Sequence, residues 1–204
     1  MDEVLLQENS GFFAAALKKD WREGQKRVVK LPEEDSKIFN FWLNWLYCHR
    51  LHLATGPDEA RTNGRFLEEA VRAYALGNVL LDFDFMDAVV DAIAVEICTL
   101  ENGENILPNE EIITLAYDKT LQKSTLRKLL VYRHATISNM AELLTEKHDA
   151  RFILDLAKLM ADSARSKPSR EDFISIAARC DFHGHEPGAE NCYRTKHHAP
   201  FSFS

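Results

Sequence analysis

One segment of the chain, residues 36–48, is apolar on nearly every side. Its sequence is SKIFNFWLNWLYC, in which only Lys37, Asn40 and Asn44 form a narrow polar line at three- and four-residue spacing. A helix with so little polar surface has to be buried. The acidic residues at 33–35 complement the dipole of a helix that starts directly after them. The sequence therefore predicts a buried helix over 36–48.

A short β-branched run precedes that helix. Val28, Val29 and Leu31 stand together, and Pro32 closes the run. This composition is typical of a strand, so we expect one strand that ends at Leu31. A single strand is not stable alone, because its backbone edges stay unpaired. The predicted strand therefore needs neighbours from elsewhere.

The order of residues between positions 10 and 47 resembles the BTB/POZ domain, in the versions that are abundant in filamentous fungi. The pattern comprises S-x-F-F, W-x-E, V-x-L-P-E and F-x-x-x-L-x-W-L-Y. It is carried by Ser10, Phe12, Phe13, Trp21, Glu23, Val29, Leu31, Pro32, Glu33, Phe39, Leu43, Trp45, Leu46 and Tyr47. Residues 66–97 are similar to the family's helix pair, with Y-x-L-G followed by F-x-D-A-V-x-D. The resemblance covers about the first hundred residues.

The resemblance implies a short sheet covered by helices, in a non-catalytic domain that dimerises or recruits other proteins such as a cullin ubiquitin ligase scaffold. Two strands and an F-x-V-H element normally precede the helix that starts here at about Val4, and only Met1-Asp2-Glu3 stand before it. A partner chain could supply the missing strands, another packing could replace them, or the gene model could be truncated, which we favour. The expected fold class is α+β and predominantly helical: a truncated BTB/POZ-like fold followed by a C-terminal helical extension.

Turn-forming residues divide the chain into three predicted parts. Asn102-Gly103 and Pro108 separate the BTB/POZ-like domain, residues 1–103, from a helical extension over 104–179. A Cys/His-rich tail follows at 180–204, and we expect it to be flexible.

Helical spacing of apolar residues recurs through the first two parts. After an exposed loop that follows Leu51, we expect a helix over 65–76 that Gly77 ends, and an amphipathic helix over 84–100. The extension is predicted to carry helices that begin near Ile112, Leu126, Met140, Phe152 and Ser169. The last of these opens with the S-x-x-D pattern of a capping box, formed by Ser169 and Asp172.

Composition and charge exclude several classes of function. Of the 204 residues 46% are apolar and 28% charged, and the net charge is −7, whereas nucleic-acid binding needs a basic surface. No apolar run approaches the ~20 residues that span a bilayer, and the N-terminus lacks the basic region of a secretory signal. We therefore expect no nucleic-acid or membrane partner, and a cytoplasmic or nuclear location. Phosphate-loop, dinucleotide, zincin and nucleophile-elbow motifs are absent, so we predict neither an enzyme nor a small-molecule substrate.

An aromatic residue stands among charges in KKDWREGQKR, residues 18–27. Trp21-Arg22-Glu23 has the hydrophobic-x-Glu form of the element by which cullin-binding BTB domains dock on their scaffold. In that role Trp21 is the apolar anchor and Glu23 the polar contact, since aromatic anchors tend to dominate interfaces. The alternative is that Trp21 covers the edge of the core.

The tail groups thiols and imidazoles. Its segment CDFHGHEPGAENCYRTKHH contains Cys180, His183, His185, Cys192 and His197, which are residue types that zinc prefers. A candidate ligand set is Cys180, Cys192, His197 and one of the other two histidines. The spacing C-x2-H-x-H-x6-C is not a well-attested zinc-finger spacing, so we favour the alternative of a disordered, His-rich end. A Cys180–Cys192 disulfide is disfavoured in a reducing compartment. A zinc-binding structural or regulatory protein is thus the second functional hypothesis, after the protein-interaction module.

Three acidic residues, Asp84, Asp87 and Asp91, follow three- and four-residue spacing on the 84–100 helix. Carboxylates in this arrangement could bind a hard divalent cation. We favour the simpler interpretation of a solvated helix face, because any amphipathic helix gives its polar side this spacing.

Overall fold

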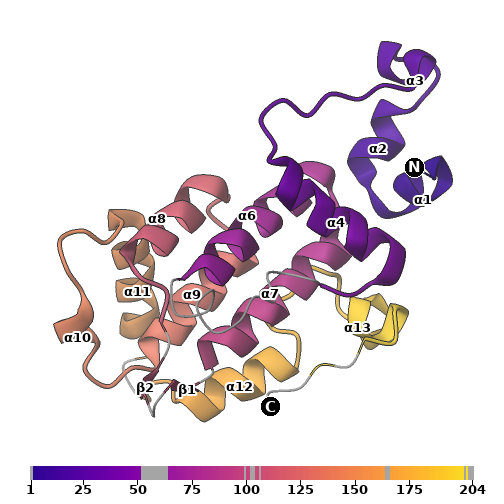
Figure 1. Cartoon of the computed structure of the whole chain (residues 1–204). Helices are drawn as coiled ribbons and strands as arrows, with labels where there is room; N and C mark the ends of the chain where they lie inside the picture. Colours follow the sequence, from indigo (N-terminus) through magenta and orange to yellow (C-terminus); the bar gives the residue numbers. More distant parts are fainter. Residues whose placement is uncertain are drawn as a thin grey trace.

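The computed structural model describes residues 2–51, 64–98, 100–101, 104–105, 107–163, 166–199 and 201, and the fold is predominantly helical (Figure 1). The first half contains α1 (Glu3–Asn9), α2 (Gly11–Ala16), α3 (Arg22–Lys26), α4 (Ser36–Cys48), α6 (Arg65–Leu80) and α7 (Phe83–Cys98). The second half contains α8 (Glu110–Lys119), α9 (Thr125–Ala135), α10 (Met140–Leu143), α11 (Ala150–Asp162), α12 (Arg170–Ala178), the 3-10 helix η1 (Ala189–Asn191) and α13 (Tyr193–Lys196). Between them lie two strands of two residues each, β1 (Leu100–Glu101) and β2 (Glu104–Asn105), paired antiparallel.

Helix α4 confirms the helix predicted from the apolar segment. Asp35 caps its N-terminus by accepting a hydrogen bond from the Lys37 backbone N–H at 2.7 Å. Trp42, Trp45 and Leu46 are buried in the main core. One side of α4 nevertheless stays open, because Tyr47 is exposed to solvent.

Helices α6 and α7 pack against each other at the centre of the bundle (Figure 1). The prediction that Gly77 ends α6 is wrong, since the helix continues to Leu80 and the left-handed residue that follows it is Leu81, with φ 54°. Gly77 serves a different purpose. A Cβ atom there would lie 2.7 Å from Cγ of Met86 and 3.0 Å from Cδ1 of Phe85, so the missing side chain makes room for α7.

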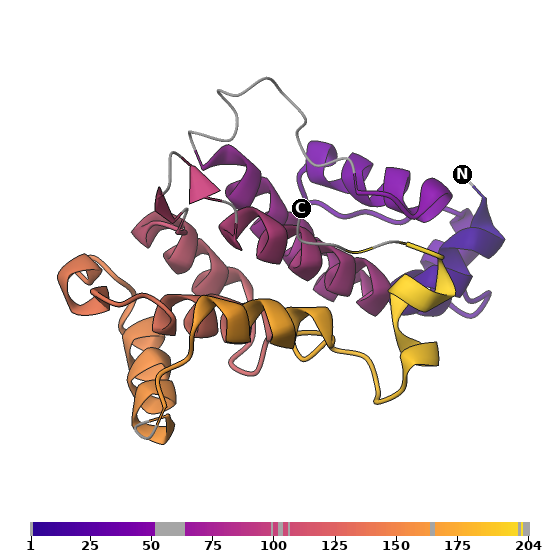
Figure 2. The same cartoon turned by 90° about the horizontal axis from the view of Figure 1, so that it is seen from below.

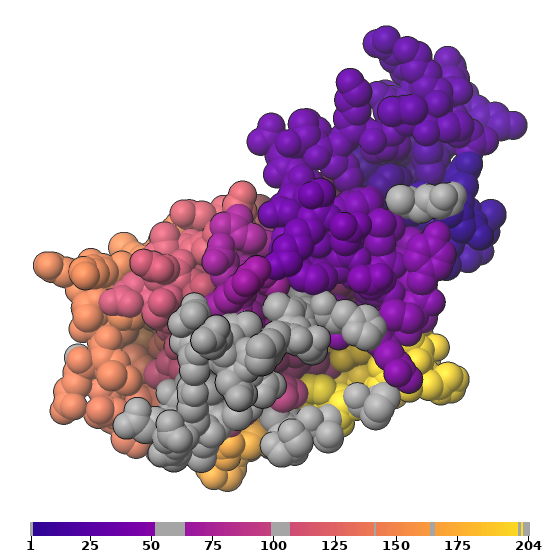
Figure 3. All heavy atoms as spheres, viewed as in Figure 1, coloured from indigo at the N-terminus to yellow at the C-terminus, as the bar shows by residue number. Residues whose placement is uncertain are grey.

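The N-terminal helices are attached to this bundle at the junction of α1 and α2. Ser10 caps α2 and also donates a hydrogen bond from its hydroxyl to the Leu80 carbonyl at 2.5 Å. Phe13 stacks on Trp42 of α4, with ring centroids 5.7 Å apart. From this attachment the N-terminal region stands out beyond the rest of the molecule (Figure 3).

The predicted strand at 28–31 does not form. The segment belongs to a long loop between α3 and α4 (Figure 1), and its first backbone N–H donates to the Glu23 carbonyl at 3.3 Å. In the described part of the chain, the backbone N–H groups of 29–31 donate to no other backbone carbonyl. The prediction is wrong because a strand needs a hydrogen-bonded neighbour, and β1 and β2 pair only with each other.

The predicted extension shares its core with the first hundred residues. The main cluster of buried apolar side chains runs from Leu6 to Tyr193 and includes residues of α8, α9 and α12. A smaller cluster joins α8, α9 and α11. The capping box of Ser169 and Asp172 at the start of α12 is confirmed. Core packing is therefore continuous across the predicted boundaries at 103/104 and 179/180.

The tail that we expected to be flexible packs on the bundle over its described residues. It contains η1 and α13, and it buries Phe182 and Tyr193. Together with α12 it lies along the lower edge of the bundle in Figure 1, the side that Figure 2 shows from below. The exposed loop that we predicted after Leu51 lies outside the described residues. Within the described ranges, no helix combines the length and apolar character needed to cross a membrane.

Candidate functional site

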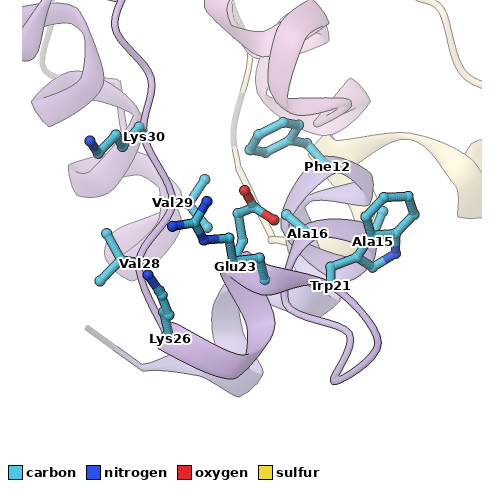
Figure 4. Close-up of a pocket in the computed structure, with 10 residues that line it drawn as sticks. Phe12, Ala15, Ala16, Trp21, Glu23, Lys26, Val28, Val29 and Lys30 are labelled. Atoms are coloured by element: carbon cyan, nitrogen blue, oxygen red, sulfur yellow. The ribbon is translucent and has the colours of Figure 1, made fainter.

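A groove of about 640 Å³ opens between the N-terminal helices and the loop that leads to α4. Figure 4 shows α2 residues on one side, the loop residues on the other and Glu23 between them. The groove is lined by Phe12, Ala15, Ala16, Trp21, Arg22, Glu23, Lys26, Val28, Val29 and Lys30. Three of these residues are cationic and one is acidic, so the polar rim of an otherwise apolar groove has a positive charge.

The structure brings the two predicted interaction residues to this groove. Trp21 is the residue before α3, and Glu23 lies in the first turn of that helix. The Trp21 side chain is 60% exposed, so the alternative that it covers the edge of the core is wrong. Gly24 lets the helix lie close to the preceding loop, because a Cβ atom at this position would collide with the Lys18 carbonyl oxygen.

A second site lies in the tail, where Cys180, His183, His185 and Cys192 converge. One potential ligand atom from each residue lies within 4.8 Å of all the others. The two sulfur atoms are 3.7 Å apart, far beyond the ~2.05 Å of a disulfide, and the thiols are free. The Sγ atom of Cys192 lies 3.6 Å from Nδ1 of His183.

The fifth predicted ligand, His197, does not join this cluster. Its ring stacks on His49 with centroids 3.7 Å apart, and its Nε2 lies 3.2 Å from a carboxylate oxygen of Asp84. The predicted ligand set is therefore corrected in two respects: both His183 and His185 belong to the cluster, and His197 does not. Sequence spacing failed here because α13 carries His197 away toward α4.

Two residues of the acidic row on α7, Asp87 and Asp91, contact the segment that carries the cluster, whereas Asp84 contacts Lys196 and His197. Asp87 and Asp91 are only 1% and 3% exposed, and the predicted solvated helix face is therefore wrong. Asp91 accepts a hydrogen bond from Tyr193 at 2.6 Å and two from Arg194 at 2.6 and 2.7 Å. Asp87 accepts one from the backbone N–H of Gly184 at 2.7 Å. The tail thus covers these carboxylates with its own donors.

Both cluster histidines use one ring nitrogen to contact an oxygen. Nε2 of His183 lies 2.9 Å from Oδ1 of Asp91, and Nδ1 of His185 lies 2.7 Å from the Glu186 carbonyl. These contacts require an N–H on the nitrogen concerned, so the second nitrogen of each neutral ring carries a lone pair. In His185 that second nitrogen, Nε2, is buried and has no hydrogen-bond partner among the described residues.

The pKa values of the two buried carboxylates are shifted in opposite directions. Burial raises the pKa of Asp87 to about 6. Burial also acts to raise the pKa of Asp91, but hydrogen bonds from His183 and Arg194 outweigh it and hold that pKa below its ordinary value. Burial raises the pKa of the Cys180 thiol to about 12, so the thiol keeps its proton at neutral pH unless a cation replaces it.

Sequence reasoning identified the thiols and imidazoles of this site but missed its carboxylate partners. Asp91 and Arg194 are about a hundred positions apart, and no spacing rule connects them. The available signal was charge, since the acidic row on one helix is complementary to the short basic, His-rich stretch at 194–198 of the tail.

No protein-family model matches the chain, and neither the curated proteins nor the solved structures contain a match.

Proposed function

We propose that the protein is a non-catalytic protein–protein interaction module that binds a partner through the groove around Trp21. The observation that carries this proposal is a tryptophan that is 60% exposed at the rim of a largely apolar groove. Contiguous exposed apolar patches rimmed by polar residues mark interaction surfaces, and tryptophans that become buried on binding are among the commonest energetic anchors of interfaces.

The loop that lines one wall supplies a second element of recognition. Val28 is exposed, and the backbone N–H groups of Val29 and Lys30 donate to no other backbone carbonyl among the described residues. A partner segment in extended conformation can pair with such a backbone and place alternate side chains in the groove. The occupant is thus an extended protein segment, with apolar side chains for Phe12 and Trp21 and acidic side chains for the rim.

The resemblance to BTB/POZ domains supports the same function, because those domains dimerise or recruit other proteins. It names two candidate partners, a second copy of this chain and a cullin scaffold. In the latter case Trp21 is the apolar anchor and Glu23 the polar contact. A non-catalytic role agrees with a sequence that lacks the motifs of known catalytic mechanisms.

Partner binding by wild type and Trp21→Ala tests the proposal. Size-exclusion chromatography with light scattering measures self-association, and a pull-down with purified cullin scaffold measures binding to that scaffold. A hot-spot residue contributes about 2 kcal/mol or more, so we expect Trp21→Ala to weaken binding roughly 30-fold. The exposed indole makes few core contacts, so the variant should fold normally.

Leu121→Ala is the matched control, because Leu121 is another highly exposed apolar residue and lies outside the groove. It should bind like the wild type. A wild-type protein that stays monomeric and binds no cullin scaffold, or a Trp21→Ala variant that binds as tightly as the wild type, contradicts the proposal.

A further inference from the structure

We propose that Cys180, His183, His185 and Cys192 together bind one zinc ion, which fastens the C-terminal tail in its folded form. The four ligand atoms lie within 4.8 Å of one another, close enough to share one cation. Two thiolates with two imidazoles form a soft donor set of the kind that zinc takes in its structural sites.

The interatomic distances match a tetrahedral zinc site. Bond lengths of about 2.3 Å to sulfur and about 2.05 Å to nitrogen place two sulfur ligands about 3.8 Å apart, and a sulfur and a nitrogen ligand about 3.6 Å apart. The corresponding distances are 3.7 Å between the two sulfur atoms and 3.6 Å between Cys192 Sγ and His183 Nδ1. These two pairs thus already lie at the spacing that a shared zinc ion requires, and the ligand atoms of the other pairs, including those with His185, lie within 4.8 Å of one another.

The histidines are oriented as metal ligands usually are. Zinc-bound histidines donate their second ring N–H to a carboxylate or a carbonyl, which fixes the ring and its tautomer. His183 does so to Asp91, and His185 does so to the carbonyl of Glu186. The remaining nitrogen of His185 is buried without a hydrogen-bond partner among the described residues, and such a lone pair is costly unless a ligand uses it. Coordination of zinc accounts for it.

Charge balance favours the same assignment. Two thiolates neutralise the two charges of the zinc ion, and the protons that they lose leave to solvent. Nη1 of Arg194 lies 3.3 Å from the sulfur of Cys180 and further stabilises its thiolate form. Four protein ligands complete the coordination and leave no open position for a substrate, which is the arrangement of a structural site.

The ion would connect the tail to the core of the bundle. It closes the segment 180–192 on itself, and through His183 it is linked to Asp91 on the buried helix α7. Arg194 and Tyr193 contact the same carboxylate directly after the last ligand. Loss of zinc should therefore loosen α13 from α7 and lower the stability of the whole chain.

The test uses the purified full-length chain, with zinc content measured by elemental analysis and binding measured by titration of the metal-free protein. Cobalt replaces zinc as a spectroscopic probe, because tetrahedral Co²⁺ with thiolate ligands gives intense visible and charge-transfer bands. The main variant is His185→Gln, since the described contacts of this side chain are few and folding should survive. Cys192→Ser is the second variant, and far-UV circular dichroism checks that both are folded.

Two controls come from the same chain. His197→Gln removes the tail histidine that lies outside the cluster, and Cys48→Ser removes an exposed thiol. We expect one zinc per chain in the wild type and both controls. Loss of a residue that only hydrogen-bonds to a zinc ligand typically weakens metal binding about 10–100-fold, so loss of the ligand itself in His185→Gln should weaken it by about tenfold or more. A chelator should lower the thermal midpoint of the wild type and leave that of Cys192→Ser unchanged.

Three results would overturn the proposal: a wild-type chain that binds neither zinc nor cobalt, a folded His185→Gln variant with wild-type affinity, or a His197→Gln variant that loses zinc equally. If Cys192→Ser does not fold, the comparison of His185→Gln with His197→Gln still decides.

Discussion

Gly77 lies inside α6 where α7 packs against it, and replacing it by alanine tests that packing. A Cβ atom at this position would lie 2.7 Å from Cγ of Met86 and 3.0 Å from Cδ1 of Phe85. Carbon atoms in contact normally stand about 3.5–4.0 Å apart. The Phe85 ring is fully buried, so it has little room to move away. The new methyl group therefore has to push the two helices apart or force side chains out of their rotamers.

Two opposing effects set the size of the change. Alanine is better than glycine in a helix interior by about 1 kcal/mol. Overpacking a core costs typically about 1–3 kcal/mol, and contact with two side chains places this site in the upper half of that range. We therefore expect Gly77→Ala to lower the free energy of unfolding by about 1–2 kcal/mol. With a slope of about 3 kcal/mol per molar urea, the midpoint falls by roughly 0.5 M.

Urea unfolding followed by circular dichroism measures the change, and two further variants sharpen it. Val79 lies on the exposed side of the same helix, and alanine has the higher helix propensity. Val79→Ala should therefore leave the free energy of unfolding unchanged or raise it slightly. Met86→Ala removes the obstructing side chain, so the double variant should be more stable than the sum of the single effects by about 0.5 kcal/mol or more. A Gly77→Ala variant that is more stable than the wild type, or single effects that add without coupling, would refute the close-packing argument.

Two buried groups give pH predictions of opposite sign. Burial raises the pKa of Asp82 from 3.8 to about 6, so the folded protein binds this proton more tightly than the unfolded chain, and stability falls as the pH rises from about 4 to about 6. At about 1.4 kcal/mol per pKa unit the loss is about 3 kcal/mol, and Asp82→Asn should remove it. Burial lowers the pKa of His134 from 6.5 to about 4, so stability is lost as the pH falls through that range, again by about 3 kcal/mol. His134→Gln should remove this loss of stability at acidic pH. Urea unfolding over a pH series measures the free energy of unfolding for both variants. A variant whose free energy of unfolding depends on pH in the same way as that of the wild type contradicts the prediction made for it.

Features fixed by neighbouring residues were predictable from the sequence. The start of α12 depends on Ser169 and Asp172, which satisfy each other's backbone groups within one turn. The start of α4 depends in the same way on Asp35. These caps need no partner from elsewhere in the chain, so the same local contacts form whatever the rest of the fold.

Features that depend on a distant neighbour were not predictable in this way. The run at 28–31 has the composition of a strand, but composition cannot supply a second strand. Gly77 has the character of a helix terminator, yet it fits equally well inside a helix that another helix approaches closely. The β-branched run can form a strand or an extended loop, and a glycine can end a helix or lie inside one. In both cases the element that packs against the residues determines which structure forms.

The tail site was predictable from the sequence in part. The donor types of the cluster follow from the sequence, because thiols and imidazoles within a short segment are themselves the signal. The choice among histidines does not follow, since it depends on where α13 turns the chain: His183 and His185 stay beside the thiols, while His197 reaches His49 of the loop after α4.

The acidic face of α7 explains why this tail, once packed, has to bring polar partners with it. Covering Asp87 and Asp91 with apolar residues would strand two carboxylates away from water at a cost of several kcal/mol. The tail avoids most of this cost for Asp91, which receives donors from Tyr193 and Arg194 and contacts His183. Asp87 is less well satisfied, since its Oδ2 lacks a hydrogen-bond partner among the described residues, and burial raises its pKa accordingly. The polar residues of the tail are thus required by the helix face that they cover, and an ion that holds His183 in place would hold this compensation in place with it.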